Sequence, residues 1–424
     1  MPTEMKPGEL APNEPLFPRQ EPAASAHSVG PVRVLFLNTR DQCGADVAVH
    51  LGLMHAFDRE RALPYVLSNS QAVDAQAMAR IYEEIPDLTH RFAPLGVPTE
   101  QLAAMSKLGK LKTMAPLAKS LGAALAQMRR DRIDIIHATD RPRDAAFSTL
   151  LARLSGKPNV VHMHSNCGDH LSQATLWGFR KASAVFAVSE YTRRELVALG
   201  LPEEKVFVVH NATDTREFGP DQCADSRDAV RREWGVPRDA PLVGIVARLI
   251  PWKGQRELIE AVARLSPNIP DLHLMIVGEG HDRDTLRRHA EKKGILQRVI
   301  FTGWHDDVRP LLASLDLFAL PSYEEPFGLA ITEAMAMQLS VIACNSGGVP
   351  EIITHGENGW LIAPRSAAEL ADAMRILLLD RRLRGSLATK ARQTVVERFS
   401  PRRQADLVAD LYSRLVIDKK GIKQ

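Results

Sequence analysis

The chain has 424 residues, of which 45% are apolar and 25% are charged, and its net charge is +3. This length predicts two or three domains with the composition of an ordinary globular protein. The small charge requires no nucleic acid as partner, no apolar stretch is long enough to span a membrane, and no secretory signal is visible, so we expect a cytoplasmic protein.

The four cysteines, Cys43, Cys167, Cys223 and Cys344, lie far apart in the sequence. Cysteines that bind a metal usually occur in closely spaced pairs, and disulfides are rare in a reducing compartment. We therefore expect these residues to be small buried hydrophobic side chains.

Residues 1–31 contain seven prolines and little periodicity, which predicts a disordered tail. The first strand is expected at residues 32–37, followed by a loop that ends at Gly44 and a helix from residue 45 to about 57. A glycine turn at this place in an α/β unit often holds a phosphate or a sugar. With a single glycine, a plain tight turn is an equally good interpretation.

Short strands then alternate with helical segments, a pattern that predicts a parallel sheet with helices on both faces. The strands are expected at residues 65–67, 133–136, 160–163, 185–188 and 206–209. Ligands of such sheets bind outside the carboxyl ends of the strands, where the pattern places His137, His164, Ser189 and Asn211. His164 is the best placed of them, although a histidine in such a position more often has a structural role.

An amphipathic helix is expected over residues 102–128, where leucine and methionine recur every three or four positions and Pro116 interrupts the pattern. Seven lysines and arginines lie between residues 107 and 132, with Asp131 as the only acid. Two interpretations remain open. The helix packs on the core with a solvated basic face, or it forms a surface for anionic lipid or an anionic acceptor.

Residues 211–241 interrupt the strand pattern and mark a boundary between two halves. In the second half, strands are expected at residues 242–247, 272–277, 299–301, 315–320, 341–343 and 360–362. Helices are expected at residues 255–265, 308–313, 329–337, 367–379, 382–398 and 401–416, with Pro401 in a first-turn position. The two halves share an architecture without a tandem repeat.

The segment 321–335 is organised like a ligand-binding loop. It follows a buried strand, and Glu325 precedes Pro326, which keeps the backbone of Glu325 out of the helical region. Gly328 allows close approach of a ligand, and the helix that follows offers free backbone amides to an anion. Glu333 lies more than one turn inside this helix, so the two carboxylates can contact different parts of one ligand.

Two cations, Arg248 and Lys253, follow the first strand of the second half. They are expected at the same sheet edge as Glu325, where they and the helix N-terminus form a site for a diphosphate. The alternative is a pair of solvated surface cations. Asp282 and Asp284 lie where another helix should begin, and helix capping explains them better than a metal ion.

In this order and spacing, the motifs of the second half resemble those of glycosyltransferase family 4. Members of this family are nucleotide-sugar-dependent retaining transferases. The resemblance extends over about residues 32–416. It is carried by Ala-Arg-Leu at 247–249, Lys-Gly at 253–254, Val-Gly-Glu-Gly at 277–280, Phe-Thr-Gly at 301–303, Leu-Pro-Ser at 320–322, the segment 325–333, and Gly-Gly-Val-Pro-Glu at 347–351 followed by Gly359.

The resemblance implies roles for single residues around the donor. Arg248 and Lys253 match the pair that holds the donor diphosphate without a metal ion. Glu325 matches a glutamate that contacts the donor sugar, and Glu333 matches one that binds the ribose hydroxyls. His164 matches a histidine near the transferred sugar.

The resemblance also assigns backbone contacts with the donor. The amides of Phe327, Gly328 and Leu329 are expected against the sugar and the phosphate. Gly44 falls in a loop where family members usually carry two adjacent glycines, and here Cys43 replaces the first of them.

The fold class implied by the resemblance is α/β, the GT-B fold, in which two Rossmann-like domains with doubly wound parallel sheets face each other across a cleft. Residues 32–212 would form the acceptor-side domain and residues 213–400 the nucleotide-sugar domain. The helix in residues 401–424 would cross back to the first domain.

The implied activity is transfer of a hexosyl sugar to an acceptor hydroxyl, with retention, in glycan, glycolipid or glycoconjugate biosynthesis. The implied partners are a nucleotide diphosphate sugar as donor and a sugar, lipid-linked or small-molecule acceptor, with no metal or other cofactor. The alternatives are a nucleotide-sugar epimerase, a disaccharide phosphorylase and a non-catalytic nucleotide-sugar-binding subunit. Contact of residues 102–132 with anionic lipid would place the protein at the inner face of the membrane.

Overall fold

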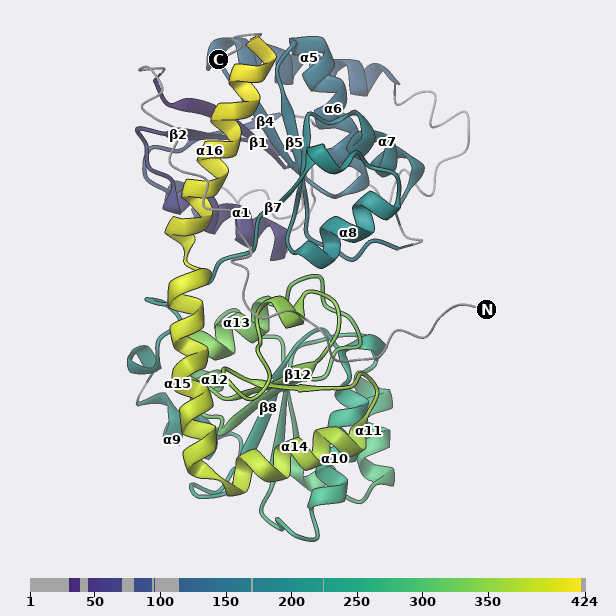
Figure 1. Ribbon diagram of the computed structural model, residues 1–424, viewed down its shortest axis with the longest axis vertical. Helices are drawn as coiled ribbons and strands as arrows, with labels where there is room; N and C mark the ends of the chain where they lie inside the picture. Colours follow the sequence, from purple (N-terminus) through teal and green to yellow (C-terminus); the bar gives the residue numbers. More distant parts are fainter. Residues whose placement is uncertain are drawn as a thin grey trace.

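The computed structural model describes residues 30–38, 45–70, 80–93, 95, 114–168, 171–223 and 225–420 (Figure 1). The expectations for residues 1–29, for Cys43 and Gly44, and for the first part of the basic helix, residues 102–113, lie outside these ranges.

Two parallel sheets form the centres of two α/β units, which lie one above the other in Figure 1. The first sheet has the strand order β3-β2-β1-β4-β5-β6-β7, and the second has the order β10-β9-β8-β11-β12-β13. The strands of the first sheet are β1 (Val32–Asn38), β2 (Ala62–Asn69), β3 (Thr89–Ala93), β4 (Ile135–Thr139), β5 (Asn159–Met163), β6 (Ala184–Ala187) and β7 (Val206–Val208). Those of the second sheet are β8 (Leu242–Val246), β9 (His273–Val277), β10 (Val299–Gly303), β11 (Leu317–Leu320), β12 (Val341–Cys344) and β13 (Trp360–Ile362).

The central strands are short apolar runs because helices cover both faces of each sheet. Every residue of β4, β5, β6, β11 and β12 is buried. Each fully buried Val, Leu or Ile side chain contributes roughly 1.5–3 kcal/mol, so these strands are the stable frame from which the loops project.

Helices connect the strands of each sheet. Those of the first unit are α1 (Ala45–Ala56), α5 (Met114–Arg130), α6 (Pro142–Ser155), α7 (Gln173–Lys181), α8 (Glu190–Ala198) and the 3-10 helix η1 (Glu203–Lys205). Those of the second unit are α9 (Ser226–Glu233), α10 (Gln255–Leu265), α11 (Arg283–Lys292), α12 (Arg309–Ala313), α13 (Leu329–Ala336), α14 (Ala367–Leu379) and α15 (Arg381–Arg398). Further 3-10 helices are η2 (Pro220–Cys223), η3 (Pro251–Lys253), η4 (Leu296–Arg298) and η5 (Val349–Glu351).

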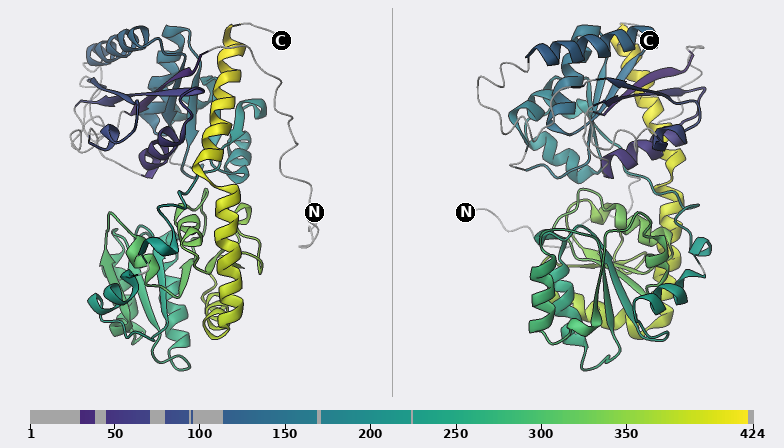
Figure 2. Two further views of the ribbon diagram at one scale, coloured as in Figure 1. Left: turned by 90° about the vertical axis from the view of Figure 1, so that its left-hand side faces the viewer. Right: turned by 180° about the vertical axis from the view of Figure 1, so that it is seen from behind.

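The last helix, α16 (Pro401–Lys420), follows α15 and packs against α1 and β1 of the first unit (Figures 1 and 2). Tyr412 is fully buried in this contact, and Arg61 pairs with Asp406 and Asp410 at 2.8 and 2.6 Å. These ion pairs are partly exposed and contribute at most about 1 kcal/mol each, so the buried apolar face of α16 supplies most of the stabilisation. The domain limits expected from the sequence stay a prediction.

The structure departs from the expectations in two places within the first sheet. β3 was not expected, because its sequence, Thr-His-Arg-Phe-Ala, has little apolar pattern and most of it is not buried. His137 was expected at the carboxyl end of its strand, and this was wrong. β4 continues to Thr139, so His137 lies in mid-strand and is completely buried.

The described part of the basic helix packs on the core. Leu121 and Met128 of α5 are buried, whereas Lys119, Arg129 and Arg130 are exposed. Leu121 and Met128 are therefore not available to a lipid surface. None of the helices in the described ranges is long and apolar enough to cross a membrane. Electrostatic contact of residues 102–132 with anionic lipid stays a prediction.

Candidate functional site

Two loops of the second unit meet where the neighbouring strands β8 and β11 end. Gly254, in the loop after β8, has a φ of 75°. A Cβ atom at this position would lie 2.2 Å from the carbonyl oxygen of Pro321, in the loop after β11. A side chain is therefore excluded here, and the two loops pack backbone against backbone.

Lys253 and Glu325 form an ion pair between these loops. Nζ of Lys253 lies 2.5 Å from Oε1 of Glu325, and the two side chains are only 17% and 6% exposed. A pair so far removed from water interacts more strongly than a surface pair, and removal of one partner would leave the other as a poorly solvated charge. The fold thus brings together the two residues that the sequence placed in one site.

The loop that carries Glu325 is supported by the glycines after β12. The N–H of Gly348 donates to the carbonyl oxygen of Glu325 at 2.8 Å. A Cβ atom on Gly347, whose φ is 60°, would lie 2.2 Å from the same oxygen. These glycines position the Glu325 backbone. This packing alone explains why glycines stand here, and no contact with a ligand is needed to explain them.

Helix α13 begins directly after this loop. Gly328 occupies its N-cap position with a φ of 110°, and no side chain caps the first turn. Phe327 is buried, and its ring packs against those of His210 and Phe399, with centroids 5.9 and 5.5 Å apart. The Ile331 N–H donates to the Gly328 carbonyl at 3.0 Å. The N–H groups before it lie at the positive end of the helix dipole, which favours an anion.

Glu333 and Arg248 complete the predicted donor residues. Glu333 lies in α13, half-buried, and desolvation raises its pKa to about 7. The side chain of Arg248 is exposed and forms no ion pair with any residue that the structure describes, while its carbonyl oxygen accepts a hydrogen bond from Gln255 at 2.8 Å. The loop after β8 therefore presents an exposed cation five residues before Lys253.

Two family models match the chain, Glycosyl transferases group 1 over residues 226–394 and Glycosyltransferase Family 4 over residues 103–217. The lipopolysaccharide core biosynthesis glycosyltransferase LpsE of Rhizobium meliloti (strain 1021) is 38% identical over 291 residues, which are 69% of this chain and 78% of that protein. The chain belongs to glycosyltransferase family 4. It is a nucleotide-sugar-dependent glycosyltransferase.

Solved structures share the architecture of this glycosyltransferase. HepE from Anabaena, in complex with UDP and glucose, has a TM-score of 0.75 and 25% identity, covering 90% of this chain and 99% of that one. A sucrose-phosphate synthase from Thermosynechococcus elongatus has a TM-score of 0.74 and 20% identity, covering 91% and 100%. The GT-B fold expected from the sequence is confirmed.

On the first-unit side of this glycosyltransferase, His164 directly follows β5, as expected. Its backbone N–H and that of Ser165 donate to Oδ2 of Asp140 at 3.2 and 3.0 Å. Asp140 follows β4, so these bonds join the loops of two neighbouring strands. Ser189 and Asn211 also follow strands but are buried, and the Ser189 hydroxyl caps α8.

Glu351, to which the sequence analysis assigned no role, joins the two units. Its carboxylate accepts hydrogen bonds from the backbone N–H groups of Glu190 and Tyr191 at 2.8 Å, and Nε2 of His210 lies 3.0 Å away. Burial raises the pKa of Glu351, but these hydrogen bonds outweigh it and hold the pKa below its ordinary value. The only available signal was its place at the end of the Gly-Gly-Val-Pro-Glu motif.

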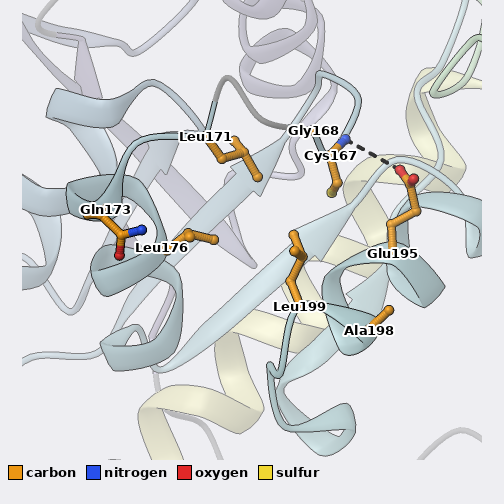
Figure 3. A pocket seen from close by; sticks show the side chains of 8 residues that line it. All are labelled: Cys167, Gly168, Leu171, Gln173, Leu176, Glu195, Ala198 and Leu199. Atoms are coloured by element: carbon orange, nitrogen blue, oxygen red, sulfur yellow. Dashed lines mark hydrogen bonds between the residues drawn. The ribbon is translucent and has the colours of Figure 1, made fainter.

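A cavity of about 460 Å³ lies between the loop after β5 and helices α7 and α8 (Figure 3). The Glu195 carboxylate in its wall accepts a hydrogen bond from the backbone N–H of Cys167 at 3.3 Å and lies 3.0 Å from the Tyr191 hydroxyl. The same hydroxyl is 2.9 Å from Glu324, the residue before Glu325. One phenol group therefore connects the cavity wall with the loop that carries Glu325, an arrangement that the sequence did not reveal.

Two further expectations concern residues outside this site. Asp282 precedes the first residue of α11 as expected, but its side chain makes no capping hydrogen bond. Cys344 is buried, and burial raises the pKa of its thiol to about 12, which fits the expected role of a small hydrophobic residue. Cys167 and Cys223 were also expected to be buried, but they are only partly buried.

Proposed function

We propose that this glycosyltransferase moves a hexosyl sugar from a nucleotide diphosphate sugar to an acceptor hydroxyl, with retention at the anomeric carbon. In this proposal the diphosphate lies between the loop after β8 and the N-terminus of α13. The observation that carries the proposal is the ion pair between Lys253 and Glu325, whose charged atoms are 2.5 Å apart. Glu325 lies just before the N-terminus of α13, and no side chain caps the first turn of this helix.

Lys253, Arg248 and the first turn of α13 would stabilise the leaving group. The diphosphate gains negative charge as the sugar departs. Each close cation–phosphate pair is worth roughly 4 kcal/mol at an effective dielectric constant of about 20, before the cost of desolvation. Two pairs that strengthen in the transition state supply several powers of ten in rate, so we expect that transfer needs no metal ion.

Glu325 has two tasks in this proposal. Its carboxylate pairs with the Lys253 ammonium and holds it in place. When the diphosphate binds, Lys253 contacts the phosphate and Glu325 contacts the donor sugar. The backbone amides of Phe327, Gly328 and Leu329 are assigned to the sugar and the phosphate.

The remaining assignments concern the two ends of the donor. Glu333 accepts hydrogen bonds from the ribose hydroxyls, and His164 contacts the transferred sugar from the opposite unit. The loop with Gly44 is assigned to the same region. The acceptor attacks on the face from which the diphosphate leaves, and the departing phosphate helps to remove its proton.

For the acceptor, we infer a saccharide of a glycoconjugate. The name of LpsE refers to the lipopolysaccharide core, and its identity of 38% supports a related acceptor. The cavity beside the His164 loop has the Glu195 carboxylate and several leucines in its wall, which suit the hydroxyls and the apolar face of a sugar ring.

The first experiment is a screen of UDP-, GDP- and ADP-sugars for an increase in unfolding temperature, because a bound ligand stabilises by mass action. The stabilising donor is then incubated with saccharide acceptors, and the anomeric configuration of the product is determined by NMR. We expect a product with the configuration of the donor. An inverted product would overturn the proposed stereochemistry.

Three further incubations test the alternatives. If the donor alone is converted to an isomerised nucleotide sugar, the protein is an epimerase. If a disaccharide and phosphate are converted to a sugar phosphate, the protein is a phosphorylase. Donor binding without turnover across the acceptor panel would identify a binding subunit.

A further inference from the structure

Three histidines meet on one face of the first sheet. His137 lies in β4 and His162 in the neighbouring β5. Because Thr139 is paired with His162, and His137 is two residues before Thr139, both histidine side chains lie on the same face. His50 of α1 joins them. One ring nitrogen from each of these three buried residues lies within 4.8 Å of those of the other two.

The ring nitrogens of this cluster lack the partners that buried imidazoles need. Nε2 of His137 and both ring nitrogens of His162 have no hydrogen-bond partner in the part of the chain that the structure describes. Backbone of Val209 approaches the His162 ring, but outside hydrogen-bonding geometry. A neutral imidazole always carries one N–H donor and one acceptor. The cluster therefore contains polar atoms that a bound ion or water would satisfy.

Tyr412 orients the His137 ring. Its hydroxyl is hydrogen-bonded to Nδ1 of His137, and both residues are completely buried. When Nδ1–H donates to the Tyr412 oxygen, Nε2 of His137 carries the lone pair, and this nitrogen has no hydrogen-bond partner among the described residues. Histidines that bind a metal ion usually donate their second ring N–H in this way, which fixes the tautomer that can act as a ligand.

The surroundings favour neutral imidazoles. The ring of Phe36 stacks on His137 at 4.9 Å, and Phe186 lies edge-on to both strand histidines at 5.8 Å. Both histidines are completely buried, and burial disfavours the charged form of an imidazole. Neutral imidazole is the form that binds a metal ion, and a site of imidazoles without carboxylates suits Zn²⁺, Co²⁺, Ni²⁺ or Cu²⁺ rather than Mg²⁺ or Ca²⁺.

His164 connects the cluster with the sheet edge. Its ring packs against that of His162 with centroids 4.1 Å apart, and its Nε2 lies 3.2 Å from Nε2 of His50. These two nitrogens share a hydrogen bond, in which one donates its N–H and the other accepts. Because His164 is partly exposed, it marks a route by which an ion reaches the buried rings.

We propose that His50, His137 and His162 form a binding site for one transition metal ion, which joins α1, β4 and β5. The ion has a structural role. It holds together the segments from which the His164 loop projects, and it is separate from the diphosphate site, where we expect no metal. The proposal does not depend on the proposed stereochemistry or acceptor.

The test uses the full chain without a polyhistidine tag. After treatment with a chelator, Zn²⁺, Co²⁺ or Ni²⁺ is added, unbound ion is removed, and bound metal is measured by elemental analysis. We expect about one bound ion per chain and an unfolding temperature raised by roughly 5–10 °C. The visible absorption spectrum of the Co²⁺ form should be that of an ion with a low coordination number. Absence of retained metal together with an unchanged unfolding temperature for all three ions would overturn the proposal.

Three variants separate a metal site from a packed group of rings or a buried water. His162→Phe keeps an aromatic ring but should lose the ion, whereas the exposed His281→Phe should retain it. Tyr412→Phe keeps all three ligands and should weaken binding by about 10–100-fold, a readout that remains if His162→Phe fails to fold. Equal metal content in the wild type and His162→Phe, or equal affinity in the wild type and Tyr412→Phe, would contradict the proposal.

Discussion

The two units of the molecule have the same architecture but build their strand-end loops in different ways. In the second unit, glycines let neighbouring loops touch, so that Gly254 lies against Pro321 and Gly347 against Glu325. In the first unit, side chains join the loops, as Asp140 does by accepting hydrogen bonds from the backbone of His164. Backbone packing tolerates few sequences, whereas a side-chain contact can be made in many ways.

This difference explains why the motifs of the sequence analysis lie in the second unit. In the function that we propose, this unit holds the donor and requires the same diphosphate geometry for every acceptor, and glycine contacts fix that geometry. In the same proposal the first unit accommodates a particular acceptor, and its cavity and its histidine cluster depend on individual side chains.

The largest effect is expected from Lys253→Ala. This change removes the cation assigned to the diphosphate and leaves the Glu325 carboxylate without its partner. We expect the rate of transfer to fall by roughly 100–1000-fold, because a lost transition-state contact of this kind costs about 3–4 kcal/mol. Lys292→Ala, an exposed lysine at the end of α11, serves as the control and should leave initial rates unchanged. If the Lys253→Ala enzyme had wild-type kinetics, the assignment of Lys253 to the diphosphate would be wrong.

Gly347→Ala tests the support of the Glu325 loop by backbone contact. Both Gly347 and Gly356 have positive φ, but a Cβ atom meets the Glu325 carbonyl at the first and open space at the second. Gly356→Ala should therefore lower the free energy of unfolding only by the strain of its φ, roughly 1 kcal/mol. Gly347→Ala should lower the free energy of unfolding by about 1–3 kcal/mol more, as measured by urea unfolding. It should also reduce the initial rate of transfer. Equal losses in the two variants would show that the close contact does not matter.

Glu333 should make donor affinity depend on pH. Its pKa of about 7 means that the carboxyl group is mostly protonated at pH 6 and mostly ionised at pH 8. A protonated group accepts ribose hydrogen bonds less well, so affinity for the nucleotide diphosphate should fall roughly tenfold between pH 8 and pH 6. Glu333→Gln should remove this dependence in calorimetric titrations, and the exposed Glu357→Gln should keep it. A flat profile in the wild type would contradict the ribose assignment.

The smallest effect is expected at the contact between the units. Glu351→Gln replaces a carboxylate that accepts two N–H groups at the start of α8. Loss of a charge-assisted hydrogen bond costs about 1.5 kcal/mol, so hydrogen exchange of the Glu190 and Tyr191 amides should become roughly tenfold faster. Unchanged exchange at these amides would mean that Glu351 does not hold the two units together.

Much of the fold could be predicted because it depends on apolar periodicity. The expected strands from 242–247 to 360–362 and the helices of the second half correspond to β8–β13 and α10–α16. β3 was missed because its edge position leaves it without an apolar pattern. His137 was placed at a strand end because β4 contains polar residues that look like the start of a loop.

The site could be predicted only where a motif fixes the backbone. The pairing of Lys253 with Glu325 confirms that the two residues share one location, while their roles stay predictions. Tyr191 and Glu351 could not be found from the sequence, because contacts between the two units bring Tyr191 to Glu351 and to Glu324. Glu195 lies one turn from Tyr191 in α8 and reveals its place only through the cavity that it lines. The meeting of His50 with the strand histidines depends in the same way on how α1 crosses the sheet.

The most direct test of the whole account is the rate of transfer in the presence of a strong chelator, compared with the rate after addition of Mg²⁺ or Mn²⁺. If Lys253, Arg248 and the α13 N-terminus carry the charge of the leaving diphosphate, the initial rates will be equal. A rate that vanishes with the chelator and returns with Mg²⁺ or Mn²⁺ would contradict the account.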